Sequence, residues 1–405
     1  MSTLDAEFLY LEDGIGHMHI GAACVFADPP PSFDEMASMI ASKLHLIPRY
    51  RQRVRRVPFE LGRPVWVDDP HFSLPYHLRH TALPSPGDDA AFCRLMGRIM
   101  SQPLDRDRPL WETWFVEGLE DGRWALVFKI HHCMVDGIAG VGLLRVVLDL
   151  EPETTVSTPQ PWDPRPEPRG VAKVLDAWGG LATDAFATTR WLSRAIVRPA
   201  DGVRFAAATV RGLARFAGEL RPTPPLSIQG SIGPHRSWAH SSASVGDVQA
   251  IRSITGATIN DVILAAVSGG YRELLLSRGE DVHRARVRSL VPVSTRHEDG
   301  EGQTDNRVST LLYDLPVHIA DPVERLMAVH DAMVKLKASH MAESGELIAA
   351  MGNLAPPMVV GSLSRIAIRA AHRLSQRSIN TVATNVPGPQ FPLYCLGREM
   401  VDYRP

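Results

Sequence analysis

The pattern of apolar and polar residues predicts strands and helices in the first half of the chain. Residues 124–130 form an almost wholly apolar run, which is typical of a buried strand. Strands are also predicted over residues 18–26 and 111–118, and turn residues at 120–122 indicate a hairpin between the last of these and the apolar run. Apolar residues at helical spacing predict a helix over residues 32–46.

The second half of the chain alternates in the same way. Strands are predicted over residues 287–293 and 379–385, and helices over residues 245–254, 260–276, 321–338 and 346–374. Asn260 stands at the start of the second helix, and we expect its side chain to cap that helix. Strands and helices that alternate in both halves predict an α/β fold with two sandwich domains.

A proline-rich stretch followed by a basic helical stretch separates the two halves. Prolines recur between residues 152 and 168, which excludes a helix or a central strand there. Residues 171–221 then show a helical pattern with more basic than acidic side chains. This basic stretch fits either a connector packed on the domains or a surface that lies on an anionic membrane or lipid droplet. We therefore expect an N-terminal domain, a connector and a C-terminal domain over residues 1–150, 151–236 and 237–405.

Composition narrows the class of protein. The chain has 405 residues, of which 44% are hydrophobic, enough for sizeable cores in two or three domains. Its formal net charge of -2 gives no attraction to nucleic acid, so no such partner is expected. Four scattered cysteines indicate reduced thiols, and we find no signal-peptide pattern and no uncharged run of about 18 apolar residues. We expect a cytoplasmic protein, with peripheral contact to the inner membrane or lipid droplets if the basic stretch binds there.

Two adjacent histidines directly follow the apolar run and precede an Asp-Gly pair: His131, His132, Asp136 and Gly137. A neutral imidazole can take a proton from a hydroxyl or thiol group as that group attacks an acyl carbonyl. Adjacent residues on extended backbone point to opposite sides, so His131 and His132 should have different tasks. Gly137 permits a tight turn. Asp136 could orient an imidazole or pair with a distant arginine, for which Arg296 is the candidate.

Other chemistries lack their residues. No third ligand at zinc spacing accompanies the two histidines, so we expect no metal ion. The patterns of serine hydrolases, zinc proteases and phosphate-binding glycine loops are absent from the sequence. Cys133 lies inside the motif, but we interpret it as a small apolar filler and not as a nucleophile. From the residues alone, acid–base catalysis and a structural role for the two histidines both stay open.

Five ordered motifs resemble those of the bacterial wax ester synthase/diacylglycerol acyltransferase family. They are LDAEFLYLE at residues 4–12, PLW at 109–111, HHxxxDG at 131–137, NDVILA at 260–265 and NVPGP at 385–389. The HHxxxDG motif also occurs in other CoA-dependent acyltransferases and in peptide-synthetase condensation domains, whereas the combination is specific to this family. The resemblance implies two chloramphenicol-acetyltransferase-like α/β sandwich domains with an active site in a tunnel between them.

The resemblance also implies a reaction. An acyl-CoA-dependent O-acyltransferase would make triacylglycerol or wax ester from diacylglycerol or a long-chain alcohol, with acyl-CoA as substrate and no cofactor. His132 would be the general base, and Asn260 would donate a hydrogen bond to the oxyanion. The PLW motif would anchor the domain core and NVPGP would shape a loop beside the tunnel. The sequence does not identify the residues that bind the substrates.

Known members of the family continue past the position of Met400 with further strands. The resemblance therefore implies that this chain lacks a C-terminal segment, and we expect a second domain with an unfilled sheet edge. Weak activity, oligomerisation or aggregation would follow from such an edge. Two alternatives also stay open, namely a weakly active or inactive homologue that binds lipids and an acyltransferase whose acceptor is bound to a carrier protein.

Overall fold

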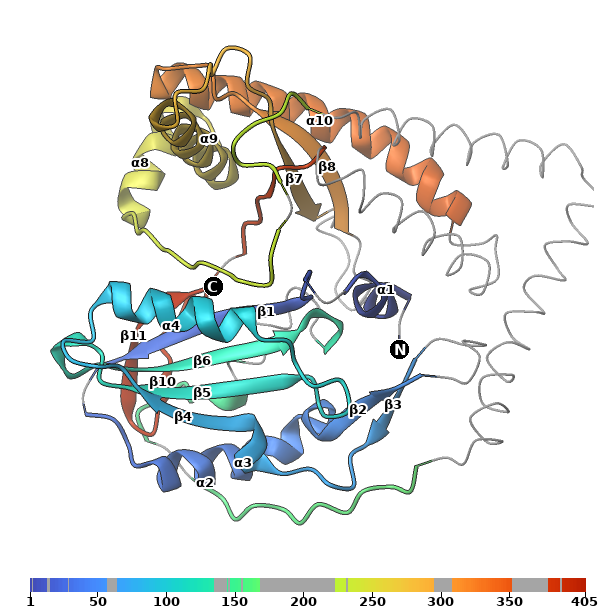
Figure 1. Ribbon diagram of the computed structural model, residues 1–405, viewed down its shortest axis with the longest axis vertical. Helices are drawn as coiled ribbons and strands as arrows, with labels where there is room; N and C mark the ends of the chain where they lie inside the picture. The colour runs from blue at the N-terminus through green and yellow to red at the C-terminus, as the bar shows by residue number, and fades with distance from the viewer. Residues whose placement is uncertain are drawn as a thin grey trace, which may run out of the picture. The chain divides into compact units, whose positions relative to one another are not determined.

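The structure is a computed structural model of the whole chain. It describes all residues except 2, 13–14, 28, 57–63, 135–143, 145, 154–155, 168–222, 231, 295–307, 352–377 and 387. The chain forms two compact units (Figure 1). Unit 1 consists of Met1–Ala182, Gly233–His240 and Val386–Pro405, and unit 2 consists of Thr183–Ile232 and Ser241–Asn385. Unit 1 is therefore built from segments that lie far apart in the sequence.

A six-stranded sheet forms the centre of unit 1. In sheet order the strands are β10 (Tyr394–Cys395), β11 (Arg398–Arg404), β1 (His19–Phe26), β6 (Trp124–His131), β5 (Trp111–Glu117) and β4 (Leu78–Ala82). All neighbouring strands pair antiparallel except β4 and β5, which pair in parallel. Every residue of β6 is buried, because helices cover both faces of the sheet at this strand.

Helix α2 (Phe33–Lys43) covers one face of this sheet (Figure 1). It begins with a capping box, in which the Ser32 hydroxyl accepts a hydrogen bond from the Glu35 backbone and the Glu35 carboxylate accepts one from the Ser32 backbone. Burial of large apolar side chains is the main force that holds this layer together. The core here includes Phe26, Met36, Met39, Trp111, Phe115, Trp124 and Phe128.

Helix α4 (Asp89–Ser101) covers the opposite face, where its C-terminal end is fastened to two strands. The Nζ atom of Lys129 on β6, which has no exposed surface, donates a hydrogen bond of 2.9 Å to the Ile99 carbonyl. On β1, His19 Nε2 lies 3.0 Å from the Met100 carbonyl. The last carbonyls of a helix need such partners. The sheet edge next to His131 is therefore held rigidly against α4.

The smaller elements of unit 1 lie around the end of the sheet. A separate antiparallel hairpin is formed by β2 (Gln52–Arg55) and β3 (Val65–Asp68). The helical elements are α1 (Thr3–Leu11), α3 (Leu74–His77) and the 3₁₀ turns η1 (Leu44–Leu46), η2 (Pro48–Arg51), η4 (Glu120–Gly122) and η5 (His132–Met134). The described part of the proline-rich stretch has neither helix nor strand, as predicted, and it is held on β3 by two hydrogen bonds from the Arg165 side chain to Asp68.

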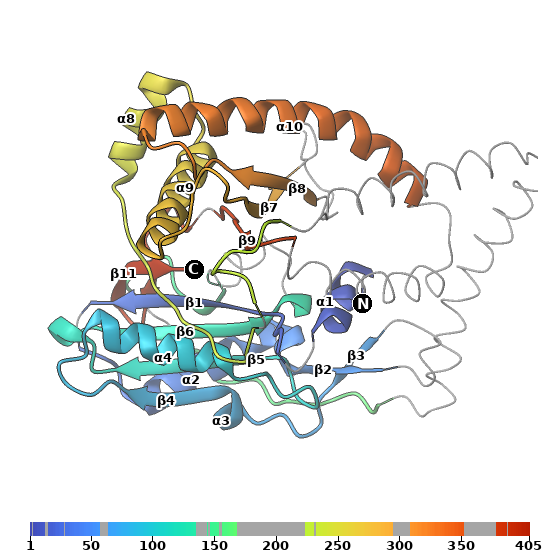
Figure 2. The same ribbon diagram turned by 45° about the horizontal axis from the view of Figure 1, so that its top comes forward.

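The described part of unit 2 combines a small sheet with three helices. The strands are ordered β8 (Val308–Leu315), β7 (Val287–Ser294) and β9 (Thr381–Val382), and the helices are α8 (Val245–Thr255), α9 (Ile259–Ser277) and α10 (Pro322–Met351). Helices α9 and α10 contact each other and share one apolar core with β7 and β8 (Figure 2). No single described helix is long and apolar enough to cross a membrane, although α8 and α9, bent by 103°, pass that test as a pair.

The predicted mixed α/β class is confirmed, and the structure changes four details. Helix α9 begins one residue earlier than predicted and its cap is Thr258, so the prediction that Asn260 caps it is wrong. Helix α10 continues through the break that we predicted after residue 338. The strand predicted over residues 379–385 is two residues long, at β9. Residues 386–405 belong to unit 1 and not to the second domain, because β11 pairs with β1.

Several predictions fall outside the described residues. They concern Asp136, Gly137 and Arg296, and the basic stretch over residues 171–221. The unfilled edge expected in the second sheet stays a prediction.

Candidate active site

The two motif histidines lie where β6 ends and η5 begins. The backbone N–H of His131 donates to the Leu110 carbonyl at 2.9 Å, and that of His132 donates to the Met18 carbonyl at 2.8 Å. Helix α1 contacts η5 (Figure 2). The loop is therefore fixed on three sides, by the PLW segment, by the residue before β1 and by α1.

The His131 ring is buried, and one of its two nitrogens is hydrogen-bonded. Only 1% of the residue is exposed. Its Nδ1 atom accepts a hydrogen bond of 3.1 Å from the Cys133 backbone, so the proton of the neutral ring must sit on Nε2. Nε2 lies 3.5 Å from a carboxylate oxygen of Glu12, a longer contact than a normal hydrogen bond. An imidazole engaged at one nitrogen and covered at the other is unsuited to take a proton from a substrate.

Glu12, directly after α1, connects the surrounding segments. Its carboxylate accepts a hydrogen bond of 2.8 Å from Arg106 Nε, and another from the Met18 backbone at 3.3 Å. Burial raises the pKa of Glu12, but the contacts with His131 and Arg106 outweigh burial and bring the pKa down to about 2. Glu12 is therefore ionised at neutral pH and ties α1 to the histidine loop.

The His132 ring has different surroundings. It stacks on Phe8 of α1, with ring centroids 3.9 Å apart and planes inclined by 17°. Burial holds the pKa of His132 below its ordinary value, and the neighbouring His131 acts in the same direction. The neutral form, which is the form that can accept a proton, is thus favoured at neutral pH. As expected for adjacent residues, His131 and His132 lie in separate environments.

The described residues do not favour a cysteine nucleophile or a metal site. Cys133 is 3% exposed and packs in an apolar cluster with Leu9 and Leu110. Burial raises the pKa of its thiol to about 12, so the thiolate is not available as a nucleophile. This fits the interpretation of Cys133 as a filler. Among the described residues, no three His, Cys, Asp or Glu side chains are grouped so that they could hold a metal ion.

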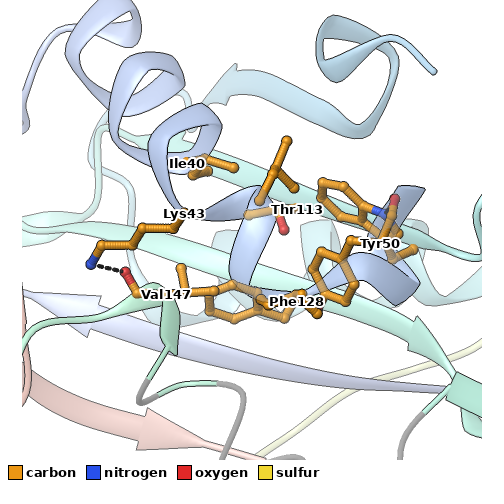
Figure 3. A pocket seen from close by; sticks show the side chains of 9 residues that line it. Ile40, Lys43, Tyr50, Thr113, Phe128 and Val147 are labelled. Carbon is orange, nitrogen blue, oxygen red and sulfur yellow. Dashed lines mark hydrogen bonds between the residues drawn. The ribbon is translucent and has the colours of Figure 1, made fainter. Parts of the chain in front are cut away.

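Trp111 of the PLW motif is an anchor of the core, as interpreted from the sequence. Its ring stacks on Tyr50 with centroids 4.5 Å apart, and its indole N–H donates to the Tyr50 carbonyl at 2.9 Å. Figure 3 shows a mostly apolar pocket under α2 that Trp111, Tyr50 and Phe128 line, beside the hydrogen bond from Lys43 to the Val147 carbonyl. None of the residues that surround His132 lines this pocket, and we assign it no substrate.

The Asn-Asp motif starts α9 in unit 2. Thr258 and Asp261 form a capping box, in which the Asp261 backbone donates to the Thr258 hydroxyl at 3.2 Å and the Asp261 carboxylate accepts from the Thr258 backbone at 2.9 Å. The same carboxylate lies 2.9 Å from His330 Nδ1 on α10. Asn260, half-buried, is the second residue of the helix. The buried Asp261 therefore joins two helices, while Asn260 is left for another task.

The NVPGP motif marks a passage between units. Asn385 is the last residue of this stretch in unit 2, and Val386 begins the final segment of unit 1. Both are exposed. Sequence reasoning assigned no role to Phe8 and Glu12, although both lie in the first motif, and it did not single out Arg106. The positions of these residues along the sequence carry no signal for contacts that form only in the tertiary structure.

Comparison with known proteins identifies the family. The chain matches the wax ester synthase/diacylglycerol acyltransferase catalytic domain over residues 1–263 and the C-terminal domain of the same family over residues 304–405. A probable diacylglycerol O-acyltransferase of Mycobacterium tuberculosis is 37% identical over 411 residues, covering 100% of this chain and 84% of that protein.

Two solved structures have the same fold. The wax ester synthase/diacylglycerol acyltransferase from Marinobacter aquaeolei superposes with a TM-score of 0.65 at 24% identity, covering 100% of this chain and 85% of that one. The first condensation domain of the calcium-dependent antibiotic synthetase, in complex with a substrate analogue, gives a TM-score of 0.50 at 18% identity, covering 99% and 82%. The predicted chloramphenicol-acetyltransferase-like fold is thus confirmed. The chain belongs to the wax ester synthase/diacylglycerol acyltransferase family and is an acyltransferase.

Proposed function

We propose that this chain transfers the acyl group of acyl-CoA to the hydroxyl of diacylglycerol or of a long-chain alcohol, with His132 as the general base. The observation that carries the proposal is the state of His132. It directly follows the rigid buried strand β6, and burial lowers its pKa, which favours the neutral form at neutral pH. The named activity of the Mycobacterium relative supports diacylglycerol as an acceptor.

The reaction needs no acyl-enzyme, because a thioester is already activated. Nδ1 of His132 is buried, so Nε2 is the nitrogen left to accept the proton of the acceptor hydroxyl. The hydroxyl oxygen forms a bond to the thioester carbonyl carbon while its proton passes to Nε2. Collapse of the tetrahedral intermediate breaks the carbon–sulfur bond, and the CoA thiolate takes the proton back from the imidazolium. The products are an ester and free CoA, and no cofactor takes part.

We assign stabilisation of the oxyanion to Asn260. This residue stands in the first turn of α9, where unpaired backbone N–H groups and the helix dipole favour negative charge. Donors of this kind are worth roughly 2.7–4 kcal/mol in the transition state where they have been removed. Asn260→Ala should then lower kcat with little change in KM for acyl-CoA.

The test uses the purified full chain with palmitoyl-CoA. Three acceptors are compared, namely dioleoylglycerol, hexadecanol and a hydroxyacyl group on an acyl carrier protein, and the products are separated by chromatography. Ester from either free acceptor, matched by release of CoA thiol, supports the proposal. If only the carrier-bound acceptor is acylated, the proposed choice of acceptor is wrong. If lipid is bound but no acceptor is acylated, the proposed acyl-transfer activity is wrong.

A matched histidine controls for the general base. His80 of β4 lies in the same unit, is exposed, and pairs with Glu117 away from the motif. His132→Ala should abolish ester formation, whereas His80→Ala should keep it. Equal losses in the two variants would show that loss of an imidazole acts through folding and not through chemistry.

A further inference from the structure

Helix α1 and the residue after it contact the histidine loop through several side chains. Phe8 stacks on His132, and Leu9 packs with Cys133 and Leu110 in the apolar cluster behind the loop. Glu12, directly after the helix, contacts His131 and Arg106. Arg106 also donates to the Leu9 carbonyl at 3.1 Å. These contacts place three side chains of one short segment against the motif.

Among the described residues, no hydrogen-bond partner orients the His132 ring. A histidine that acts as a base or ligand is commonly oriented by a carboxylate or carbonyl at its other nitrogen. Nδ1 of His132 is buried and has no hydrogen-bond partner of normal geometry among the described residues. The ring of Phe8, whose centroid lies 3.9 Å from that of His132, is a described group that can fix the plane of this imidazole.

Phe8 can do this only while α1 keeps its position. Glu12 supplies the fastening, because its carboxylate joins the end of α1 to Arg106, to the Met18 backbone and to His131. The Met18 carbonyl in turn accepts the hydrogen bond from the His132 backbone. The same few residues thus hold both the helix that carries Phe8 and the backbone that carries His132.

We propose that Phe8 and Glu12 are positioning residues of the acyl-transfer site. Glu12 locks α1 onto the histidine loop, and Phe8 holds the His132 ring in plane and covers one of its faces. This inference rests on the proposed role of His132 as the base. It gives the first motif of the family resemblance a physical task, which is to orient the base through a stacked ring.

The stack also bears on when the base is active. The charged groups that act on the ring are Asp5 on α1, which raises its pKa, and His131, which lowers it, while Arg49 and Arg106 act on the adjacent Cys133. Burial is the largest influence and lowers the pKa of His132. Because Phe8 covers one face of the ring, its removal should let water in and raise that pKa.

The experiment compares variants of matched trios in unit 1. Phe33, His80 and Glu117 form a comparable set away from the motif, in which Phe33 stacks on His80 at 5.1 Å between ring centroids and Glu117 pairs with the same histidine. At the motif, Phe8 stacks on His132 and Glu12 contacts the neighbouring His131. In Phe8→Ala we expect kcat for ester formation to fall about tenfold or more, with KM for palmitoyl-CoA nearly unchanged. The acid limb of the pH profile should move upward by about half a unit. Phe8→Tyr should restore both values, because it keeps the ring.

Glu12→Gln should lower kcat about threefold to tenfold, since the amide keeps the shape but loses the charge that Arg106 binds. Phe33→Ala and Glu117→Gln should leave kcat and the pH profile as in the unaltered protein. Equal losses in Phe8→Ala and Phe33→Ala, or an unmoved acid limb in Phe8→Ala, would overturn the inference.

A second readout separates this inference from the proposed function. The ring of His132 is titrated by NMR in protein with labelled histidine, and its signal is assigned from its loss in His132→Gln. A titration midpoint of His132 that is higher in Phe8→Ala than in the unaltered protein, but unchanged in Phe33→Ala, supports the inference. This holds even if the unaltered protein makes no ester, a result that would overturn only the proposed function. The same midpoint in all three proteins would overturn the inference whatever the activity.

Discussion

Two histidine sites, one in each unit, use their neighbours in opposite ways. In unit 2, His330 is held by a hydrogen bond of 2.9 Å to the Asp261 carboxylate, which also caps α9. In unit 1, His132 is held by an aromatic ring, and its Nδ1 has no hydrogen-bond partner of normal geometry among the described residues. The first arrangement joins two helices, and in the second the described contact with the imidazole is made by its flat face.

The two sites differ in the group that holds the imidazole ring, a carboxylate at His330 and an aromatic ring at His132. Burial raises the pKa of Asp261, but hydrogen bonds from His330 and Thr258 outweigh burial and keep the pKa below its ordinary value. A carboxylate at Nδ1 can also orient a base, but here it takes part in the cap of α9 and joins that helix to α10. At the motif, the described group that orients the imidazole is the stacked ring of Phe8, which occupies neither ring nitrogen.

Replacing the two histidines in turn tests whether they have different roles. His132→Ala should lower kcat for ester formation by about 10²–10⁴-fold, because a general base contributes that much. His330→Ala should change kcat far less. Rates with palmitoyl-CoA and circular dichroism of both variants provide the check. Near-normal turnover by folded His132→Ala protein would contradict the assignment of the base.

The next effect concerns stability in unit 2. Asp261→Ala should cost about 2–4 kcal/mol of unfolding free energy, since it removes a cap and leaves two donors without their acceptor. The His330 side chain is 25% exposed, so His330→Ala should cost only about 1 kcal/mol. Urea unfolding of the two variants measures the difference. If both cost the same, the carboxylate does not serve two partners.

The third effect is a dependence on pH in unit 1. The pKa of Glu12 is about 2 in the folded protein, below its ordinary value of 4.5. A lowered carboxyl pKa adds stability that is complete above the ordinary value and is lost as the pH falls through the folded value. The unaltered protein should therefore lose on the order of 1–3 kcal/mol more than Glu12→Gln between pH 4.5 and 2. Parallel melting curves of the two proteins across that range would contradict the ion pairing of Glu12.

The smallest predicted loss of unfolding free energy comes from removing the caps of α2 and α9. Both units contain a capping box, at Ser32 before α2 and at Thr258 before α9. Ser32→Ala and Thr258→Ala should each cost about 1 kcal/mol, the usual worth of a cap. A much larger loss in Thr258→Ala would show that the cap also supports the pairing of Asp261 with His330.

The sequence predicted the elements whose residues differ sharply from their surroundings. β6 and the second half of β1 are recognisable because their apolar runs are buried on both faces. β11 was missed because REMVDYR has four charged residues and no regular alternation of apolar and polar side chains, so it resembles an exposed segment. Its pairing with β1 is a tertiary contact that no local pattern encodes.

The candidate site divides in the same way. The motif located His131 and His132, and alternation along the strand separated their environments. The cap of α9 was misplaced because Thr258 and Asn260 are both cap-forming residues, and the acidic residue three positions after Thr258 decides between them. The contacts of Phe8 and Glu12 with the two histidines join segments more than a hundred residues apart, and only the fold reveals them.

The strand order β10-β11-β1-β6-β5-β4 has a consequence for synthesis on the ribosome. β1 cannot acquire its neighbour β11 until about 370 further residues have been translated, and closing so long a loop is slow. During that time a nascent chain would carry β1 as an open edge, which is a template for pairing with other strands. Chaperone binding to ribosome-held intermediates should thus persist until residues 398–404 leave the exit tunnel.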